Sequence, residues 1–221
     1  MDFYAFVEGP LLWFAFLTFM IGTVLRMALV VARTVRMDQP MVRFFRWKYV
    51  LATFARWLLP LNKDMLKNPV FMTLVYVFHI CLIVVPVFLG GHVALWDESR
   101  FEWSWPSIPD VWADWMTLTL IAISLFFFLR RLISADIRLI STLSDYLLIV
   151  VTALPFVTGY FLSHGTVDSV AFIGENITLI HMLSGELMLI LIPLTRLSHS
   201  FLFFFSRAAT GIEFGRRGYS M

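Results

Sequence analysis

Apolar residues fill five long stretches of this chain, and most of its polar residues lie between them. The stretches are residues 11–31, 70–91, 114–133, 146–163 and 177–203. Each is close in length to the roughly 20 apolar residues that a helix needs to cross the hydrocarbon core of a bilayer. We therefore predict an all-α integral membrane bundle of five transmembrane helices.

A further segment, residues 40–60, alternates aromatic and aliphatic residues with basic ones at helical spacing. This pattern predicts an amphipathic helix on the cytoplasmic surface of the membrane. Such a helix either anchors in anionic lipid headgroups or docks a soluble partner protein, and the pattern fits both roles.

Composition supports the membrane assignment. Hydrophobic residues make up 60% of the 221 residues and charged residues 14%, with a mean hydropathy of +0.83. These values exclude an ordinary soluble domain and leave a single membrane domain over residues 1–221. Cys81 is the only cysteine, so the chain alone can form neither a disulfide nor a cysteine-ligated iron–sulfur cluster.

The charged residues predict how the chain crosses the membrane. Every lysine and arginine except Arg100 lies in or beside the first connection, the third connection or the C-terminal end. Most acidic residues lie at the N-terminus and in the second and fourth connections. The positive-inside rule then predicts an external N-terminus and a cytoplasmic C-terminus, in the cytoplasmic (inner) membrane of a bacterium or archaeon. Because topology accounts for the basic residues, we expect no nucleic-acid partner.

Two histidines of the last apolar stretch suggest the chemistry. His181 and His199 are eighteen residues apart, which is five turns of an uninterrupted helix, so both rings would lie on one stripe. Their separation along the axis would be roughly 27 Å, at about 1.5 Å per residue. That length is close to the ~30 Å thickness of the hydrocarbon core. One helix would thus present a metal ligand near each membrane surface.

The second stretch carries two more histidines and runs in the opposite direction. His79 would face His199 on the cytoplasmic side, and His92 would face His181 on the outer side. Polar side chains are costly in lipid and tend to be functional there. Each pair can supply both axial ligands of a haem b, which leaves no open position for oxygen. We predict two haems b, with His164 as the reserve ligand for the outer one.

The spacing of His79 and His92 requires an interruption of the helix between them. Thirteen residues give about 20 Å and a rotation of about 220°, which is too short and on the wrong face for the partners in the last stretch. Pro86 can kink the helix, and Gly90 and Gly91 can unwind its end. We expect extended residues there to reset both the length and the angle.

Four more residues are candidates for the site. Gly185 lies one turn after His181, where a missing side chain either admits a porphyrin or packs a neighbouring helix. Arg196 either pairs with a haem propionate or anchors the chain at the lipid surface. Glu186 is a possible quinone or proton site, or else bonds to a Ser or Thr of another helix. His164 is a second possible quinone or proton site.

The chain resembles the gamma subunit of respiratory nitrate reductase, a membrane cytochrome b. The resemblance covers nearly the whole chain, and its most specific part is the spacing in the last stretch. The matching strings are His181-x3-Gly185-x7-Pro193-x2-Arg196-Leu197-x-His199, Arg130-Arg131-Leu132-x-Ser134-x3-Arg138 with Thr142 and Asp145, Ile21-Gly22-x2-Leu25-Arg26, and Phe78-His79-Ile80. A longer first cytoplasmic connection and more widely spaced histidines in the second stretch place it nearer the wider group, which includes cytochrome b subunits of heterodisulfide-reductase-type and sulfur-respiration complexes.

The resemblance implies two haems b, with menaquinol or menaquinone as substrate near the outer haem. It also implies a cytoplasmic iron–sulfur partner, and the wider group adds a periplasmic multihaem cytochrome c. We expect a subunit of a hetero-oligomeric oxidoreductase complex of anaerobic respiration that is inactive alone. The alternatives are a haem-free membrane anchor of such a complex and a proton-conducting transporter subunit.

Overall fold

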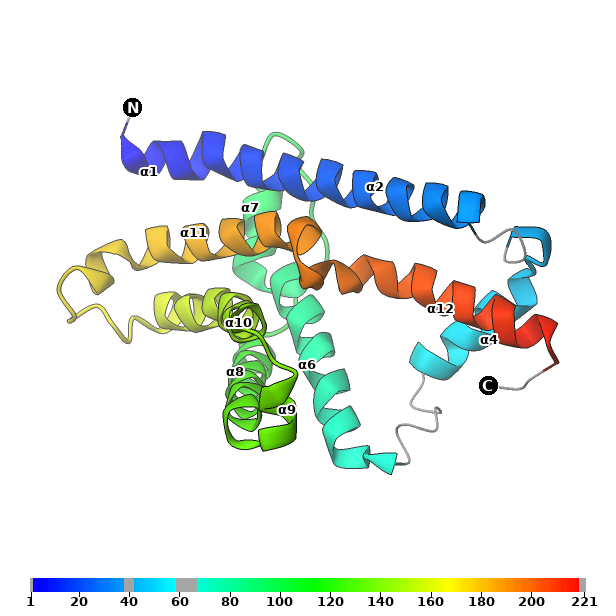
Figure 1. The fold of residues 1–221 in the computed structure, drawn as a ribbon. Coiled ribbons are helices and arrows are strands. Elements are labelled where there is room, and N and C mark those ends of the chain that lie inside the picture. The colour runs from blue at the N-terminus through cyan, green and yellow to red at the C-terminus, as the bar shows by residue number, and fades with distance from the viewer. Residues whose placement is uncertain (1, 38–41, 59–66, 219–221) are drawn as a thin grey trace. The chain divides into compact units, whose positions relative to one another are not determined.

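The structure is a computed structural model that describes residues 2–37, 42–58 and 67–218 (Figure 1). These residues form helices joined by short connections, with one isolated β-bridge between Leu89 and Ile108. Five of the described helical segments are long and apolar enough to cross a membrane: Phe3–Met37, Pro69–Phe88, Asp110–Ile133, Leu143–His164 and Ile173–Leu194. The predicted all-α fold with five membrane spans is confirmed, and the chain is a multi-pass membrane protein.

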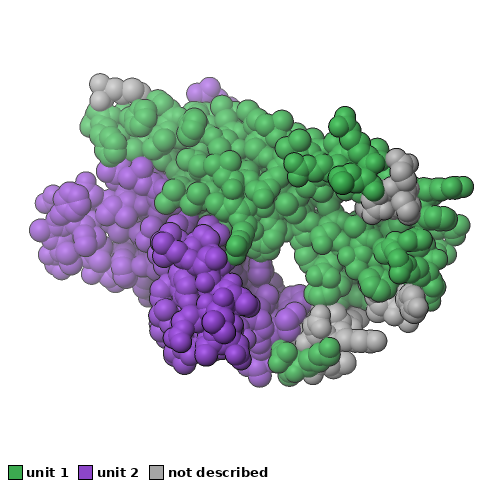
Figure 2. Space-filling model, viewed as in Figure 1, with its two compact units in different colours: residues 1–69, 186–221 green, residues 70–185 purple. Residues whose placement is uncertain are grey.

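The chain divides into two compact units (Figure 2). Unit 1 contains residues 1–69 and 186–221, and unit 2 contains residues 70–185. Helix α11 (Ile173–Leu194) contributes residues to both.

Unit 2 is built on α6 (Pro69–Phe88), α8 (Asp110–Ile133) and α10 (Leu143–His164), with the short helices α7 (Gly90–Asp97) and α9 (Ala135–Leu139). Its core consists of Cys81 and Val85 from α6, Leu120 from α8 and Phe156 from α10. Thr142 and Asp145 form a capping box at the start of α10, and this satisfies amide groups that have no partner within the helix.

The second span is interrupted between its two histidines, as predicted. Leu89 is extended (φ −64°, ψ 131°) and separates α6 from α7. The break leaves carbonyl groups at the end of α6 without helical partners, and in lipid such groups need other donors. The donors are His92 Nδ1 to Pro86 at 2.9 Å, Trp105 Nε1 to Val87 at 2.8 Å and the Ile108 amide to Phe88 at 2.9 Å. The extended conformation predicted at this break is adopted by Leu89.

Unit 1 begins with one long helical segment made of α1 (Phe3–Phe6), the π-helical turn η1 (Val7–Leu11) and α2 (Leu12–Met37). The π-helical turn contains Pro10, which has no amide hydrogen for the helical ladder. This segment extends beyond both ends of the span predicted over residues 11–31.

The last span also breaks, and here the structure differs from the single helix predicted over 177–203. Helix α11 ends at Leu194, and Thr195 is extended (φ −121°, ψ −167°). A short 3₁₀ turn, η2 (Arg196–Ser198), leads into α12 (His199–Arg216). Pro193 weakens the helix at this point because it cannot donate a backbone hydrogen bond. His181 and His199 therefore lie on two different helices, and the five-turn argument does not apply to them.

The amphipathic segment predicted at 40–60 contains α4 (Trp47–Leu58), and residues 40, 41, 59 and 60 lie outside the described residues. Helix α4 packs on α12 within unit 1. Gly211 and Gly215 of α12 face Tyr49 and Thr53 of α4 so closely that a Cβ at either glycine would collide with them. One face of α4 is thus covered by the chain itself, which the sequence did not predict.

Candidate functional site

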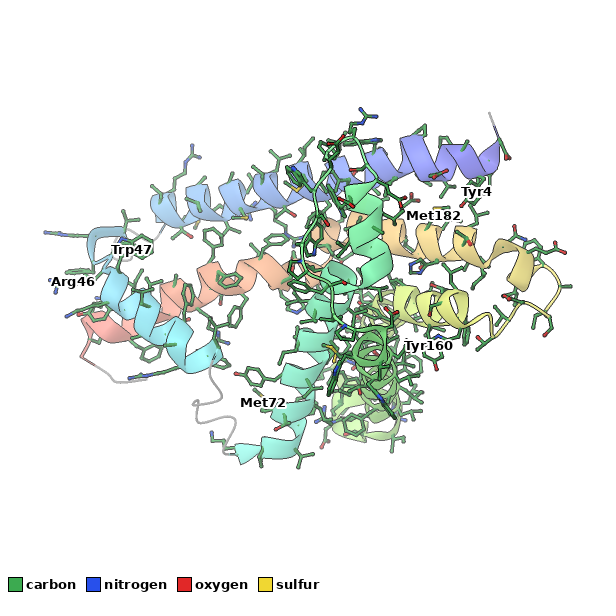
Figure 3. The ribbon with its side chains drawn as sticks, turned by 180° about the vertical axis from the view of Figure 1, so that it is seen from behind. Tyr4, Arg46, Trp47, Met72, Tyr160 and Met182 are labelled. Carbon is green, nitrogen blue, oxygen red and sulfur yellow. The ribbon has the colours of Figure 1, made fainter. Side chains whose placement is uncertain are left out.

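His92 of α7 and His181 of α11 face each other in unit 2. Their ring centroids are 6.1 Å apart and their planes differ by 11°. In Figure 3, Met182 marks the residue that follows His181 in α11, and Tyr160 marks α10, the helix that supports the His181 ring. The predicted outer pair is therefore brought together.

The spacing of the two rings suits one metal ion between them. A bond from a metal to an imidazole nitrogen is about 2.0 Å long. The ring centre lies roughly 1.1 Å beyond that nitrogen, so two rings on opposite sides of one metal have centroids about 6.2 Å apart. The observed 6.1 Å agrees with this value.

The His92 ring is oriented by the end of α6. Its Nδ1 lies 2.9 Å from the Pro86 carbonyl oxygen. A carbonyl oxygen can only accept, so Nδ1 carries the proton and Nε2 keeps its lone pair. Metal-bound histidines typically donate their other ring N–H to such a partner. The break at Leu89 thus supplies both the turn that places His92 and the acceptor that orients it.

The His181 ring is held by two neighbouring residues of α10. Its Nδ1 lies 3.1 Å from Thr158 Oγ1, and the Thr158 hydroxyl donates to the Leu154 carbonyl at 2.9 Å. With its proton given to Leu154, the Thr158 oxygen can accept from Nδ1, and in that tautomer Nε2 of His181 keeps its lone pair. A Cβ added to Gly159 would lie only 3.0 Å from His181 Cε1. Glycine at this position makes room for the imidazole ring.

Two glycines beside the histidines leave space for a larger group. Gly185 follows His181 by one turn, and Gly91 precedes His92. A Cβ added to either would meet no atom within 4 Å. The predicted opening at Gly185 is thus present, and Gly91 is a second one. Two opposed imidazoles have the donor set that a haem requires, and the backbone at Gly91 and Gly185 does not obstruct a group placed beside them.

His164, the reserve ligand, makes different contacts. Its Nε2 lies 3.3 Å from Asp114 Oδ2, and its Nδ1 lies 3.0 Å from the Tyr160 carbonyl oxygen and 2.9 Å from Ser163 Oγ. Its ring also stacks on the Tyr160 ring at 4.2 Å. The structure therefore places His92, and not His164, opposite His181.

The predicted inner pair, His79 and His199, falls in two different units. His79 lies in α6, and its Nδ1 is 2.7 Å from the Val75 carbonyl oxygen. His199 begins α12, and its Nδ1 is 2.9 Å from the carbonyl oxygen of Arg196 in η2. Each ring thus has the Nδ1–carbonyl contact seen in His92. Their pairing stays a prediction, and so does the contact of Arg196 with a propionate.

Glu186 is 4% exposed, and neither of its carboxylate oxygens has a hydrogen-bond partner among the residues that the structure describes. The alternative of a hydrogen bond from Glu186 to a Ser or Thr is therefore not seen in the described part of the chain. A role of Glu186 in binding quinone or protons stays a prediction.

No family model matches the chain, and no solved structure matches it. It is 32% identical to a protein of Nitratidesulfovibrio vulgaris (strain Hildenborough), over 97% of this chain and 95% of that protein. The chain belongs to the same family as that protein. The match covers nearly all of both chains.

Sequence reasoning missed the residues that hold the two rings. Thr158 and Gly159 lie in a different span from His181, and nothing in the spacing shows that they meet it. The Pro86 carbonyl was missed for another reason. Pro86 was read as a kink, and a carbonyl is available to a side chain only where the helical ladder is broken.

Proposed function

We propose that this protein is a dihaem b membrane subunit of a respiratory electron-transfer complex. It would move electrons between the menaquinone pool and an iron–sulfur or cytochrome partner. The observation that carries the proposal is the opposed pair His92 and His181, each with Nδ1 engaged and Nε2 left as the metal-binding atom. The resemblance of the last span to nitrate reductase gamma subunits supports it.

His92 and His181 would hold the outer haem, and His79 and His199 the inner one. When bound at its histidine pair, each haem would supply one-electron redox chemistry. The protein supplies the orientation. The Pro86 carbonyl and the Thr158 hydroxyl fix the ring planes, and Gly91 and Gly185 leave the space beside them.

Oxidation of a quinol releases two protons with its two electrons, so a base close to the outer surface is needed. His164 of α10, paired with Asp114 of α8, is the favoured acceptor, because α10 also carries Thr158 and Gly159, which contact the His181 ring. His164 follows Gly159 by five residues, which is about 7.5 Å along a helix. Glu186 is the second candidate acceptor.

The electrons would pass to soluble subunits, since the chain has only one cysteine and forms no iron–sulfur cluster alone. The proposed orientation places the inner haem, and with it a cytoplasmic iron–sulfur subunit, on the side of α12 and α4. A periplasmic multihaem cytochrome c would adjoin the outer haem. The protein would then act as one subunit of a hetero-oligomeric complex in the cytoplasmic membrane.

The test is to purify the protein from a haem-supplied host and to record reduced-minus-oxidised spectra with haem counts. We expect a b-type α band and two haems per chain. His92→Ala and His181→Ala should each lose one haem, whereas the matched variant His164→Ala should keep both. Absence of a b-type band would leave a haem-free anchor as the better description, and an unchanged haem content in both ligand variants would show that His92 and His181 do not hold a haem.

A further inference from the structure

Arg26 of α2 reaches the break in the last span. Its Nη1 donates to the Pro193 carbonyl oxygen at 2.5 Å and to the Thr195 carbonyl oxygen at 3.1 Å. All three residues belong to unit 1. The positive-inside rule accounts for a basic residue near the predicted cytoplasmic end of the first span, but it does not account for these two hydrogen bonds.

The Pro193 carbonyl needs a donor because the helical ladder stops here, whereas the Thr195 carbonyl already accepts from the Ser198 amide at 3.3 Å. The Leu197 amide would bond to the Pro193 carbonyl in a continuous helix, but it donates instead to Thr195 Oγ1 at 3.2 Å. An unsatisfied carbonyl costs several kcal/mol in lipid. Arg26 supplies the missing hydrogen bond at Pro193 and also brings a positive charge to the carboxyl end of α11, where the helix dipole favours it.

Gly22, one turn before Arg26 on the same face of α2, lets the two helices approach. A Cβ added to Gly22 would lie 2.8 Å from Pro193 Cβ, closer than side-chain carbons come. We call Gly22 and Arg26 the α2 clamp. Its glycine admits the buried proline, and its arginine binds the carbonyl groups on either side of Leu194.

The clamp contacts the turn that leads from α11 to His199. The Thr195 carbonyl that Arg26 binds also accepts from the Ser198 hydroxyl at 2.8 Å, and Ser198 is buried. His199 follows directly, and its Nδ1 bonds to the Arg196 carbonyl of the same turn. The direction in which His199 leaves the break is thus set by the turn that Arg26 holds.

We propose that Arg26 is a positioning residue for His199 and thereby for the inner haem. The inference rests on the proposed function, since it requires His199 to be a haem ligand. The resemblance assigns the inner haem to residues of the second and fifth spans alone. The inference goes further, because it gives a residue of the first span a role in positioning one of the ligands.

The experiment compares Arg26→Gln and Arg26→Lys with the matched control Arg33→Gln, an exposed arginine two turns further along α2. The readouts are haem content, the electron paramagnetic resonance signals of the two ferric haems and their midpoint potentials. We expect Arg26→Gln to shift or remove the inner-haem signal while the outer signal persists, with total haem lowered by up to about half. Arg26→Lys, which keeps a cationic donor, should restore it.

The outcomes separate this inference from the proposed function. If the wild type holds two haems and His199→Ala loses one, but Arg26→Gln leaves the inner signal and potential unchanged, the positioning role is wrong and the function stands. If the wild type holds no haem, both fail. If Arg26→Gln loses both haems, Gly22→Ala decides. A change confined to the inner haem supports the clamp, and a change in both haems overturns it.

Discussion

Gly159→Ala tests directly how Thr158 and Gly159 of α10 hold the His181 ring. Apolar atoms in contact settle at about 3.5–4.0 Å, so the new Cβ, 3.0 Å from His181 Cε1, would intrude by roughly 0.5–1.0 Å. The same Cβ would lie 3.4 Å from Nδ1, the atom bonded to Thr158. We expect the ring to turn away from α10, which would weaken that hydrogen bond and tilt Nε2.

The expected magnitude follows from the size of this overlap. Overpacking of this kind costs about 1–3 kcal/mol. At about 1.4 kcal/mol per factor of ten, this is roughly a 5- to 140-fold loss of haem affinity at the outer site. Alanine in place of glycine favours the helix itself by up to about 1 kcal/mol. The stability of the haem-free protein should therefore change little, so that a lost haem reports on the site and not on unfolding.

The assay is transfer of haem b from the purified variant to an excess of apomyoglobin, together with thermal unfolding of the haem-free protein. Gly9→Ala is the control, because a Cβ at Gly9 meets no atom within 4 Å and Gly9 lies in the other unit. We expect faster loss of one haem in Gly159→Ala alone. Equal rates in wild type, Gly159→Ala and Gly9→Ala would refute the reasoning.

Three further predictions concern single side chains. Thr158→Val removes the acceptor for His181 Nδ1 and should weaken the outer haem about 10- to 100-fold, as measured by haem dissociation; an unchanged rate would show that the bond does not orient the ring. Gly185→Leu fills the open space and should exclude the outer haem from a chain that still folds by circular dichroism, whereas retention of two haems would place the porphyrin elsewhere. A hydrogen bond from Arg216 holds the pKa of Glu213 below its usual range. At pH values above the ordinary carboxyl pKa, this ion pair therefore stabilises the end of α12. The stabilisation is lost as the pH falls through the lowered pKa of Glu213. Unfolding temperatures of wild type and Glu213→Gln should accordingly differ slightly at neutral pH and converge in acid, and a difference that grows in acid would contradict the sign.

The helix breaks at Leu89 and Thr195 show which features of the fold the pattern of residues can predict and which it cannot. The interruption at Leu89 was predictable, because two histidines thirteen residues apart cannot both serve antiparallel partners on an unbroken helix, and Pro86, Gly90 and Gly91 lie between them. The break at Thr195 was not predictable in this way. Pro193 stands within a strongly apolar run, and a proline there either kinks a span or ends it.

The outcome at Pro193 depends on a residue far away in the sequence. A helix can end within an apolar run only if donors reach its freed carbonyls, and Arg26 of the first span provides them. The contacts of His181 could not be predicted for the same reason, because Thr158 and Gly159, which hold its ring, belong to another span.

The sequence by itself determined the five spans, the helical class and the histidines worth considering, because lipid demands long apolar runs and makes each polar residue within them conspicuous. The tertiary structure decided which histidines of unit 2 meet, which groups orient their rings and where the last span ends. Those features depend on contacts between helices, and the periodicity of a single helix carries no information about its neighbours.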